Sequence, residues 1–320
     1  MRLPLTSAFL LFLSACDFSC NGGTAGSVRS IPRFNEDYAY EQILQYEKFG
    51  PKLPGTAEHR KAGDWIVDTL KKQGFTVLEQ STVIEVASGA KLPIRNIIAQ
   101  RNPSTKKRVL LSAHWDNRAH ADRDPQKKNH TRNVPGVNDG GSGVAVLLSI
   151  AKAIHDLPKQ DTEVGVDLAF WDAEDGGTYS EPETFCLGSQ YWAKNPLPEN
   201  YRAEYGINFD MVGRKGSLFP VESYSKRFAP EVVRAWKKAA IRSGNGDSFI
   251  DDEVGPIVDD HFFVSKGREF PMIDVIYMTT EGKFAPEWHT VDDTSEHISR
   301  DVMKAVGQTA LELIYGTGEN

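Results

Sequence analysis

Most of this 320-residue chain alternates between segments with helical spacing of apolar residues and short apolar segments typical of buried strands. Helices are predicted at residues 37–48, 56–73, 141–157, 228–243 and 300–315. Strands are predicted at residues 75–84, 93–100, 109–115, 164–172, 205–213 and 270–277. Strands that alternate with helices predict an α/β domain, because parallel strands are joined by helical crossovers that cover the sheet. We therefore expect a three-layer α/β/α fold around a mostly parallel, mixed central sheet.

The first 15 residues are predicted to be a lipoprotein signal peptide. Arg2 gives them a positive start, and the apolar run at 5–13 is too short to span a bilayer as a mature helix. The run leads into LSAC, ending at Cys16, which resembles the site where bacterial lipoproteins are cut before a lipidated cysteine. An ordinary signal peptide that happens to contain a cysteine is the alternative. We expect export to the periplasm, membrane attachment only through Cys16, and a flexible tether at 16–32.

Residues 33–316 are predicted to form one domain, since no internal repeat and no interior linker rich in Pro or Ser interrupts them. A net charge of −7 argues against a nucleic-acid-binding surface, which needs a basic footprint. The three cysteines (Cys16, Cys20 and Cys186) are too few for a disulfide scaffold, although export would allow Cys20 and Cys186 to pair. None has zinc-ribbon spacing, so a metal would be held by His and carboxylates.

Acidic residues and histidines follow the predicted strands, where sites form in open α/β sheets. They are His114, Asp116, Asp139, Asp172, Glu174, Asp175, Asp210, Asp259, Asp260, His261 and His289. Taken singly, each has an ordinary explanation: Asp139 could cap a helix, and VDDH at 258–261 could be a capping turn. Asp292 and Asp293 are expected to be surface turn residues. The whole set, flanked by glycines that permit close backbone approach, favours a shared site.

Zinc is the metal that this combination of donors favours. Zn²⁺ accepts imidazole nitrogen and carboxylate oxygen, and a catalytic zinc site keeps one position open. Mg²⁺ and Ca²⁺ prefer shells made only of oxygen. His114 and Asp116 are two residues apart at a strand end and so face the same side, which suits a ligand and its outer partner.

Seven stretches in this order resemble the M28-type zinc aminopeptidase superfamily and, within it, bacterial zinc-dependent glutaminyl cyclases related to the animal enzymes. The stretches are SAHWDNRAHADRD (112–124), PGVNDGGSG (135–143), FWDAEDGG (170–177), FCLGSQYWA (185–193), NFDMVG (208–213), VDDHFFVSKG (258–267) and PEWHTVDD (286–293). Together the resemblance covers nearly all of residues 33–316. It implies a catalytic domain with the zinc-aminopeptidase fold.

By position, the resemblance implies a set of site residues. One zinc ion per chain would be held by Asp139, Asp175 and His289. Glu174 would be the general acid/base, with Asp210 and Asp259 completing an acidic hydrogen-bonded network. The substrate pocket would be lined by Trp288, Phe185 and Asp274. Possible ligands of a second metal, or outer partners of the first, would be His114 and Asp116.

Four positions depart from the pattern of the animal enzymes. Asp175 replaces a Glu and Asp274 replaces a His, as in bacterial relatives. Phe185 replaces a pocket Trp, which leaves one aromatic wall altered. Ala113 stands where the animal enzymes have a cysteine, so their disulfide beside the His-x-Asp motif cannot form here.

The implied reaction closes the N-terminal glutamine of a peptide or protein into pyroglutamate and releases ammonia, and we expect a monomer. Since nucleophile and electrophile belong to one residue, the protein mainly has to impose the closed geometry. One alternative is a zinc aminopeptidase, with a water nucleophile and usually two metals. Asp259 and Trp288 favour the cyclase. A non-catalytic binding module on this fold is disfavoured, because the implied ligands and base are all present.

Overall fold

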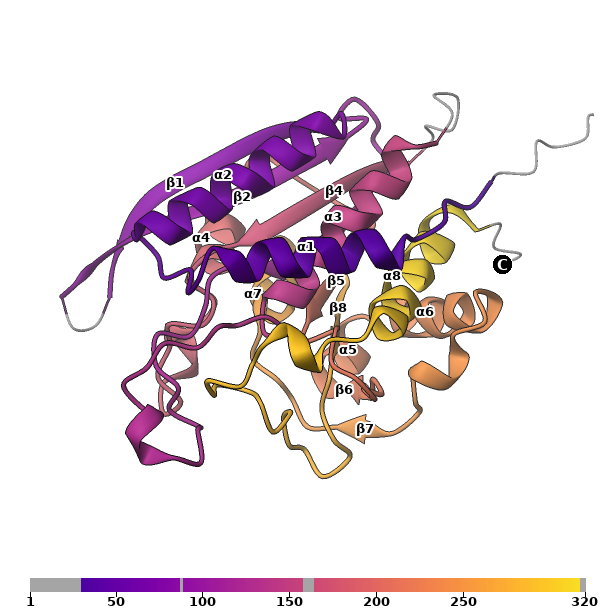
Figure 1. Cartoon of the computed structure of the whole chain (residues 1–320). Coiled ribbons are helices and arrows are strands. Elements are labelled where there is room, and N and C mark those ends of the chain that lie inside the picture. Colours follow the sequence, from indigo (N-terminus) through magenta and orange to yellow (C-terminus); the bar gives the residue numbers. More distant parts are fainter. Residues whose placement is uncertain (1–29, 87–88, 158–163, 317–320) are drawn as a thin grey trace, which may run out of the picture.

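Within residues 30–86, 89–157 and 164–316, which the computed structural model describes, a six-stranded mixed sheet runs through the centre of the molecule (Figure 1). Its strands are β1 (Thr76–Glu85), β2 (Lys91–Arg101), β3 (Arg108–His114), β4 (Gly165–Trp171), β5 (Tyr205–Asp210) and β8 (Met272–Ile276). Their spatial order is β1-β2-β4-β3-β5-β8. β4, β3, β5 and β8 run parallel, whereas β2 is antiparallel to both of its neighbours. This confirms the predicted mostly parallel, mixed sheet.

Helices cover both faces of this sheet. They are α1 (Glu36–Lys48), α2 (Ala57–Lys72), α3 (Gly141–His155), α4 (Leu187–Lys194), α5 (Ser223–Phe228), α6 (Pro230–Arg242), α7 (Asp260–Arg268) and α8 (Arg300–Tyr315). Short 3₁₀ turns lie at Lys127–Asn129, Pro182–Thr184, Gly246–Ser248 and Ser295–His297, and a small separate strand pair is formed by β6 (Val221–Glu222) and β7 (Glu253–Val254). In Figure 1, α1 crosses in front of α3, against which it packs.

The two sides of the sheet carry separate apolar clusters, because successive strand residues point to opposite faces. Ile97 of β2 belongs to the larger cluster, built with α1, α2, α3, α6 and α8. Its neighbour Ile98 belongs to the smaller cluster, which includes Trp192 of α4 and Val264 of α7. The three predicted layers are therefore present.

Local sequence signals explain where several elements begin and end. α2 starts after Thr56, whose side chain accepts a hydrogen bond from the His59 amide, and the chain turns away at Gly74, with a φ of +78°. The predicted helix 228–243 was wrong in its start. The helix is interrupted at Ala229, between α5 and α6. Pro230 is the first residue of α6, because proline suits the first turn of a helix.

The predicted strand at 205–213 is also shorter than expected. It ends at Asp210, because Met211 adopts a φ of 49°, a left-handed conformation that does not continue a strand. The turn leaves Asp210 at the carboxyl end of β5, next to the ends of its parallel neighbours.

Several predictions concern residues outside the described part of the chain. The signal peptide at 1–15, the lipidated Cys16, Cys20 and most of the tether at 16–32 lie there. Among the described residues, no helix is both long and apolar enough to cross a bilayer.

Candidate metal and catalytic site

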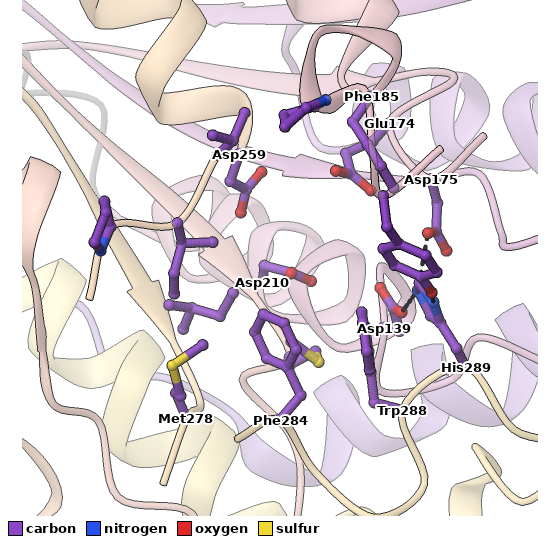
Figure 2. A pocket seen from close by; sticks show the side chains of 17 residues that line it. Asp139, Glu174, Asp175, Phe185, Asp210, Asp259, Met278, Phe284, Trp288 and His289 are labelled. Carbon is purple, nitrogen blue, oxygen red and sulfur yellow. Dashed lines mark hydrogen bonds and ion pairs between the residues drawn. The ribbon is translucent and has the colours of Figure 1, made fainter. Parts of the chain in front are cut away.

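A cavity of about 320 Å³ opens beyond the carboxyl ends of the parallel strands (Figure 2). Its polar lining consists of Asp139, Glu174, Asp175, Tyr179, Asp210, Asp259 and His289. Its apolar lining consists of Pro182, Phe185, Met211, Pro256, Ile257, Val258, Ile276, Met278, Phe284 and Trp288. One end of the cavity is therefore strongly acidic, and its walls are largely apolar and aromatic.

The three predicted metal ligands converge at one place in this cavity. The Nε2 atom of His289 lies 2.9 Å from Oδ1 of Asp175 and 3.2 Å from Oδ2 of Asp139. Figure 2 shows these side chains pointing toward one another. In a tetrahedral zinc site with bonds of about 2.0–2.1 Å, ligand atoms lie about 3.3 Å apart. The donor set and its spacing fit a small cation, and the buried Oδ2 of Asp139 accepts no hydrogen bond.

Asp139 is held by a carboxylate that the sequence prediction misplaced. Asp293 was predicted to be a surface turn residue, but only 1% of it is exposed. Its carboxylate accepts hydrogen bonds from the amides of Asn138, at 2.7 Å, and Asp139, at 3.1 Å. Asp139 is not a helix cap, since Gly140 occupies the N-cap position of α3. Asp293 therefore fixes the backbone that carries a predicted ligand.

Asp116 holds the neighbouring segment in the same way. Its carboxylate accepts hydrogen bonds from the amides of Glu174, at 2.9 Å, and Asp175, at 3.1 Å. It also lies 3.6 Å from Nδ1 of His114. Asp116 thus lies behind the site and fixes the backbone of the Glu174–Asp175 pair.

Glu174 lies beside the ligand group and faces further carboxylates. Its Oε1 accepts a hydrogen bond from the buried thiol of Cys186 at 3.3 Å, and its Oε2 lies 3.8 Å from Nδ1 of His114. Burial raises the pKa of Glu174 well above its ordinary value, and the charges of Asp175 and Asp259 raise it further, although His114 opposes them. A proton-accepting carboxylate with this environment suits general acid/base chemistry.

Asp210 lies near the predicted ligand Asp139, and Asp259 lies near Glu174, within 4.8 Å between side-chain oxygens in each pair (Figure 2). Burial raises the pKa of Asp210 to about 7, against the effect of its hydrogen bond with His114. Asp259 is the N-cap of α7, and its side chain accepts a hydrogen bond from the Asp260 amide, so the capping turn that was considered for VDDH is present. Its other oxygen accepts a hydrogen bond from Asn208 at 3.1 Å. Asp259 is therefore both a helix cap and part of the acidic wall.

A second group of possible ligands adjoins the first. The Nε2 atom of His114 lies 3.0 Å from Oδ1 of Asp139 and 3.2 Å from Oδ1 of Asp210, and all three side chains are buried. Burial opposes protonation of His114, but its bonds to the surrounding aspartates outweigh burial and raise its pKa. A protonated His114 would neutralise part of the acidic charge, and a neutral one could ligate a second cation.

Of the three residues predicted to contact the substrate, the two aromatic ones line the cavity and the acidic one does not. Trp288 stacks on His289, with ring centres 3.9 Å apart, and Phe185 lines the cavity. Asp274, predicted to contact substrate, does not line it. The amide of Asn208 donates to both Asp259 and Asp274, so Asp274 lies one hydrogen bond behind the acidic wall. This corrects the prediction of a direct contact.

Tyr179 is a site residue that the sequence analysis missed. Its hydroxyl lies 2.6 Å from Nδ1 of His289, and its ring lines the cavity. It comes from a loop, GGTYSEP at 176–182, without any periodic or motif signal of its own. Only its position four residues after Asp175 could have drawn attention to it.

Known proteins with this fold include both glutaminyl cyclases and exopeptidases. The chain is 43% identical to the structure titled Tannerella forsythia glutaminyl cyclase, over 90% of this chain and 100% of that chain, with a TM-score of 0.85. The Porphyromonas gingivalis glutaminyl cyclase matches with 42% identity, 88% and 98% coverage and a TM-score of 0.85. A structure titled as a Zn-dependent exopeptidase from Parabacteroides distasonis matches with 44% identity, 90% and 100% coverage and a TM-score of 0.86.

A curated relative is more distant and longer. The chain is 24% identical over 286 residues to aminopeptidase YwaD of Bacillus subtilis, covering 84% of this chain but only 54% of that protein. The sequence model described as peptidase family M28 matches residues 96–314, which is more than half of the chain and contains every predicted metal ligand. This match and the shared fold establish that the chain belongs to peptidase family M28.

Proposed function

We propose that this chain is a zinc-dependent glutaminyl-peptide cyclotransferase, which converts N-terminal glutamine into pyroglutamate. The observation that carries the proposal is the placement of the Glu174 carboxylate beside Asp139, Asp175 and His289 in one cavity with an aromatic wall. Similarity above 40% identity to solved glutaminyl cyclases supports it.

In the proposed reaction the substrate supplies both reacting atoms. Its α-amine nitrogen forms a bond to Cδ, the carbonyl carbon of the glutamine side-chain amide, and the bond from that carbon to the amide nitrogen breaks. Glu174 takes a proton from the α-amine and returns it to the departing nitrogen, which leaves as ammonia. Zinc, when held by Asp139, Asp175 and His289, would supply a Lewis acid that favours negative charge on the γ-carbonyl oxygen.

The remaining pocket residues act on binding and protonation. The charges of Asp259 and Asp260 near Glu174 favour its holding the transferred proton, and Asp210 extends the acidic wall beside His114 and Asp139. The walls at Phe185 and Trp288 suit an uncharged side chain rather than a cationic or anionic one. The rest of the bound peptide would extend out of the open end of the cavity. We therefore expect the enzyme to discriminate little among peptides that differ after the first residue.

A zinc aminopeptidase is the second candidate function. The group formed by His114, Asp139 and Asp210 favours it, because a second metal beside the first would suit activation of a water nucleophile. Two structures of comparable similarity are titled as a Zn-dependent exopeptidase and as a leucine aminopeptidase precursor. In that function Glu174 would take its proton from water, so its position alone does not separate the two reactions.

One assay separates the two candidates. Purified protein loaded with Zn²⁺ would be incubated with matched dipeptides that begin with Gln or with Leu. A cyclotransferase releases ammonia and a cyclised dipeptide from the Gln substrate and leaves the Leu substrate intact. Release of free amino acids from either dipeptide would instead establish the peptidase.

A further inference from the structure

We propose that Tyr179, together with Asp122, is the outer partner of His289, and that the Tyr179 hydroxyl controls how tightly this chain holds zinc. The inference rests on the proposed zinc site. It concerns a positioning residue: Tyr179 acts on the metal through the imidazole of His289.

The contacts of His289 show which of its two ring nitrogens faces the metal site and which one donates a hydrogen bond to Tyr179. Nε2 of His289 faces the carboxylates of Asp139 and Asp175, so this nitrogen is the one available to a metal. Nδ1 then carries the proton and donates it to the Tyr179 oxygen, 2.6 Å away. The Tyr179 hydroxyl in turn donates to Oδ1 of Asp122 at 3.3 Å. Such outer partners fix the ring orientation and raise the basicity of a ligating histidine.

Arg118 connects this chain of hydrogen bonds to a second ligand. One of its terminal nitrogens donates to Asp122 at 2.7 Å. The other donates to the carbonyl oxygens of Asp175, at 2.9 Å, and Gly177, at 2.7 Å. His289 and Asp175 are far apart in the sequence, yet both are tied to the 118–122 segment. The hydrogen bonds among Arg118, Asp122 and Tyr179 therefore set the relative position of two of the three predicted metal ligands.

Tyr179 differs from a buried outer partner in where its ring lies. The residue is 38% exposed, and its ring lines the cavity with centres 5.9 Å from Trp288 and 5.8 Å from Phe185. His289, in contrast, is only 2% exposed. The ring of Tyr179 can thus contact the substrate, whereas its hydroxyl contacts His289, the predicted metal ligand. Removing the hydroxyl alone should affect the metal without removing the wall.

The test measures zinc binding directly in Tyr179→Phe and in the unmodified protein. Each protein would compete for Zn²⁺ with a chromophoric chelator, which gives an affinity independent of catalysis. We expect Tyr179→Phe to bind zinc about 10–100-fold more weakly, the usual effect of losing such a partner. The matched control is Tyr40→Phe, the same chemical change on α1, where the ring lies under Arg300. It should bind zinc as the unmodified protein does.

Two further measurements separate positioning from general loss of structure. The metal-free forms of Tyr179→Phe and the unmodified protein should unfold at the same temperature, while the visible spectrum of bound Co²⁺ should change in the variant because the ring of His289 is freed. Asp122→Asn, which keeps Tyr179 but weakens its acceptor, should lower zinc affinity in the same direction. If Tyr179→Phe proves unstable, Asp122→Asn tests the support that Tyr179 and Arg118 share, and equal zinc affinity in that variant would overturn the inference.

The outcomes distinguish this inference from the proposed function. Equal zinc affinity in the variants and the unmodified protein would overturn the role of Tyr179, even if the protein cyclises glutamine. Failure of the unmodified protein to bind zinc would overturn the proposed zinc enzyme as well. Weaker zinc binding with unchanged metal-free stability would support the inference.

Discussion

Glu174 is the residue whose surroundings bear most directly on catalysis. It directly precedes the predicted ligand Asp175 in the sequence, lies within 4.8 Å of the Asp259 carboxylate and accepts a hydrogen bond from Cys186. This side chain is oriented by groups that do not ligate the predicted metal: Asp116 holds its backbone, and Cys186 holds its carboxylate. Its removal should therefore leave the ligands in place.

Glu174→Gln should lower turnover of a Gln-initiated dipeptide by at least about 10²–10⁴-fold, the range attributed to general acid/base catalysis, because the amide cannot carry the proton. Zinc content after dialysis should stay equal to that of the unmodified protein. His289→Ala should lose both zinc and turnover, and the exposed Glu199→Gln should lose neither. Substantial activity in Glu174→Gln would remove Glu174 from its proposed role.

Lys52 is a buried lysine whose protonation makes the stability of the fold depend on pH. It is fully buried, and its amine donates to the carbonyls of Gly50, at 2.7 Å, and Tyr46, at 3.3 Å. Burial lowers the pKa of Lys52 to about 7, against the attraction of Asp293 and Glu47. The unfolded chain, with a lysine pKa of about 10.4, binds the proton more tightly over the interval between these values.

Stability should therefore rise with pH between about 7 and 10 through Lys52, by up to about 1.4 kcal/mol per pH unit. The burial penalty is complete below pH 7 and is absent above the unfolded pKa. Comparing urea unfolding of the unmodified protein and Lys52→Met at pH 7.5 and 9.5 measures this effect, since the titrations of groups that do not interact with Lys52 cancel in the difference. A difference in unfolding free energy that does not change with pH would contradict the depressed pKa.

At the scale of elements, the start of α3 packs directly on the sheet. A Cβ added at Gly143 would lie 2.3 Å from the Phe209 carbonyl oxygen and 2.6 Å from the Ala113 side chain. Both contacts involve rigid strands, β5 and β3, so neither can yield cheaply. The close approach brings the turn that carries Asp139 to the carboxyl ends of these strands.

Gly143→Ala should destabilise the protein by about 1–3 kcal/mol, as overpacking typically does, because α3 must move away from the sheet. Thermal unfolding of the metal-free protein measures this loss. Gly255→Ala is the matched control, since nothing lies within 4 Å of its Cβ position. Equal unfolding temperatures for the two variants would contradict the tight packing of α3.

At the scale of the whole molecule, the site collects residues from most of the chain. Its predicted ligands come from the turn before α3, the segment after β4 and the segment after β8. The described domain begins with residues that pack on its last helix: Gln308 of α8 accepts a hydrogen bond from the Phe34 amide and donates to the Pro32 carbonyl. We propose that the chain before this point is a tether from a lipidated Cys16, in an exported, periplasmic monomer.

Cys16→Ser should prevent lipidation and release the protein from membranes into the soluble fraction, because one modified cysteine is the only proposed anchor. Metabolic labelling with a radioactive fatty acid and fractionation of cells measure both effects. Cys20→Ser, a similar change nearby, should leave labelling and membrane association intact. Labelling that persists in Cys16→Ser would contradict the predicted lipoprotein signal.

The sequence by itself was enough to predict the layers, most element positions and most of the acidic residues and histidines that meet at the site. Apolar periodicity is a local property, and parallel strands bring their carboxyl ends to one edge, so His114, Glu174 and Asp210 could be expected together. The breaks at Ala229 and Met211 were missed, because each depends on one residue's backbone angles.

Only the tertiary structure decided which groups support the site from behind. Asp293 binds the amide of Asp139, 154 residues away, and Tyr179 binds His289, 110 residues away, so no local pattern marks either pair. Asp274 was expected in the pocket, but Asn208 and Asp259 stand in front of it. The positions of strands follow from short-range periodicity, whereas hydrogen bonds between distant segments exist only after the whole chain has packed.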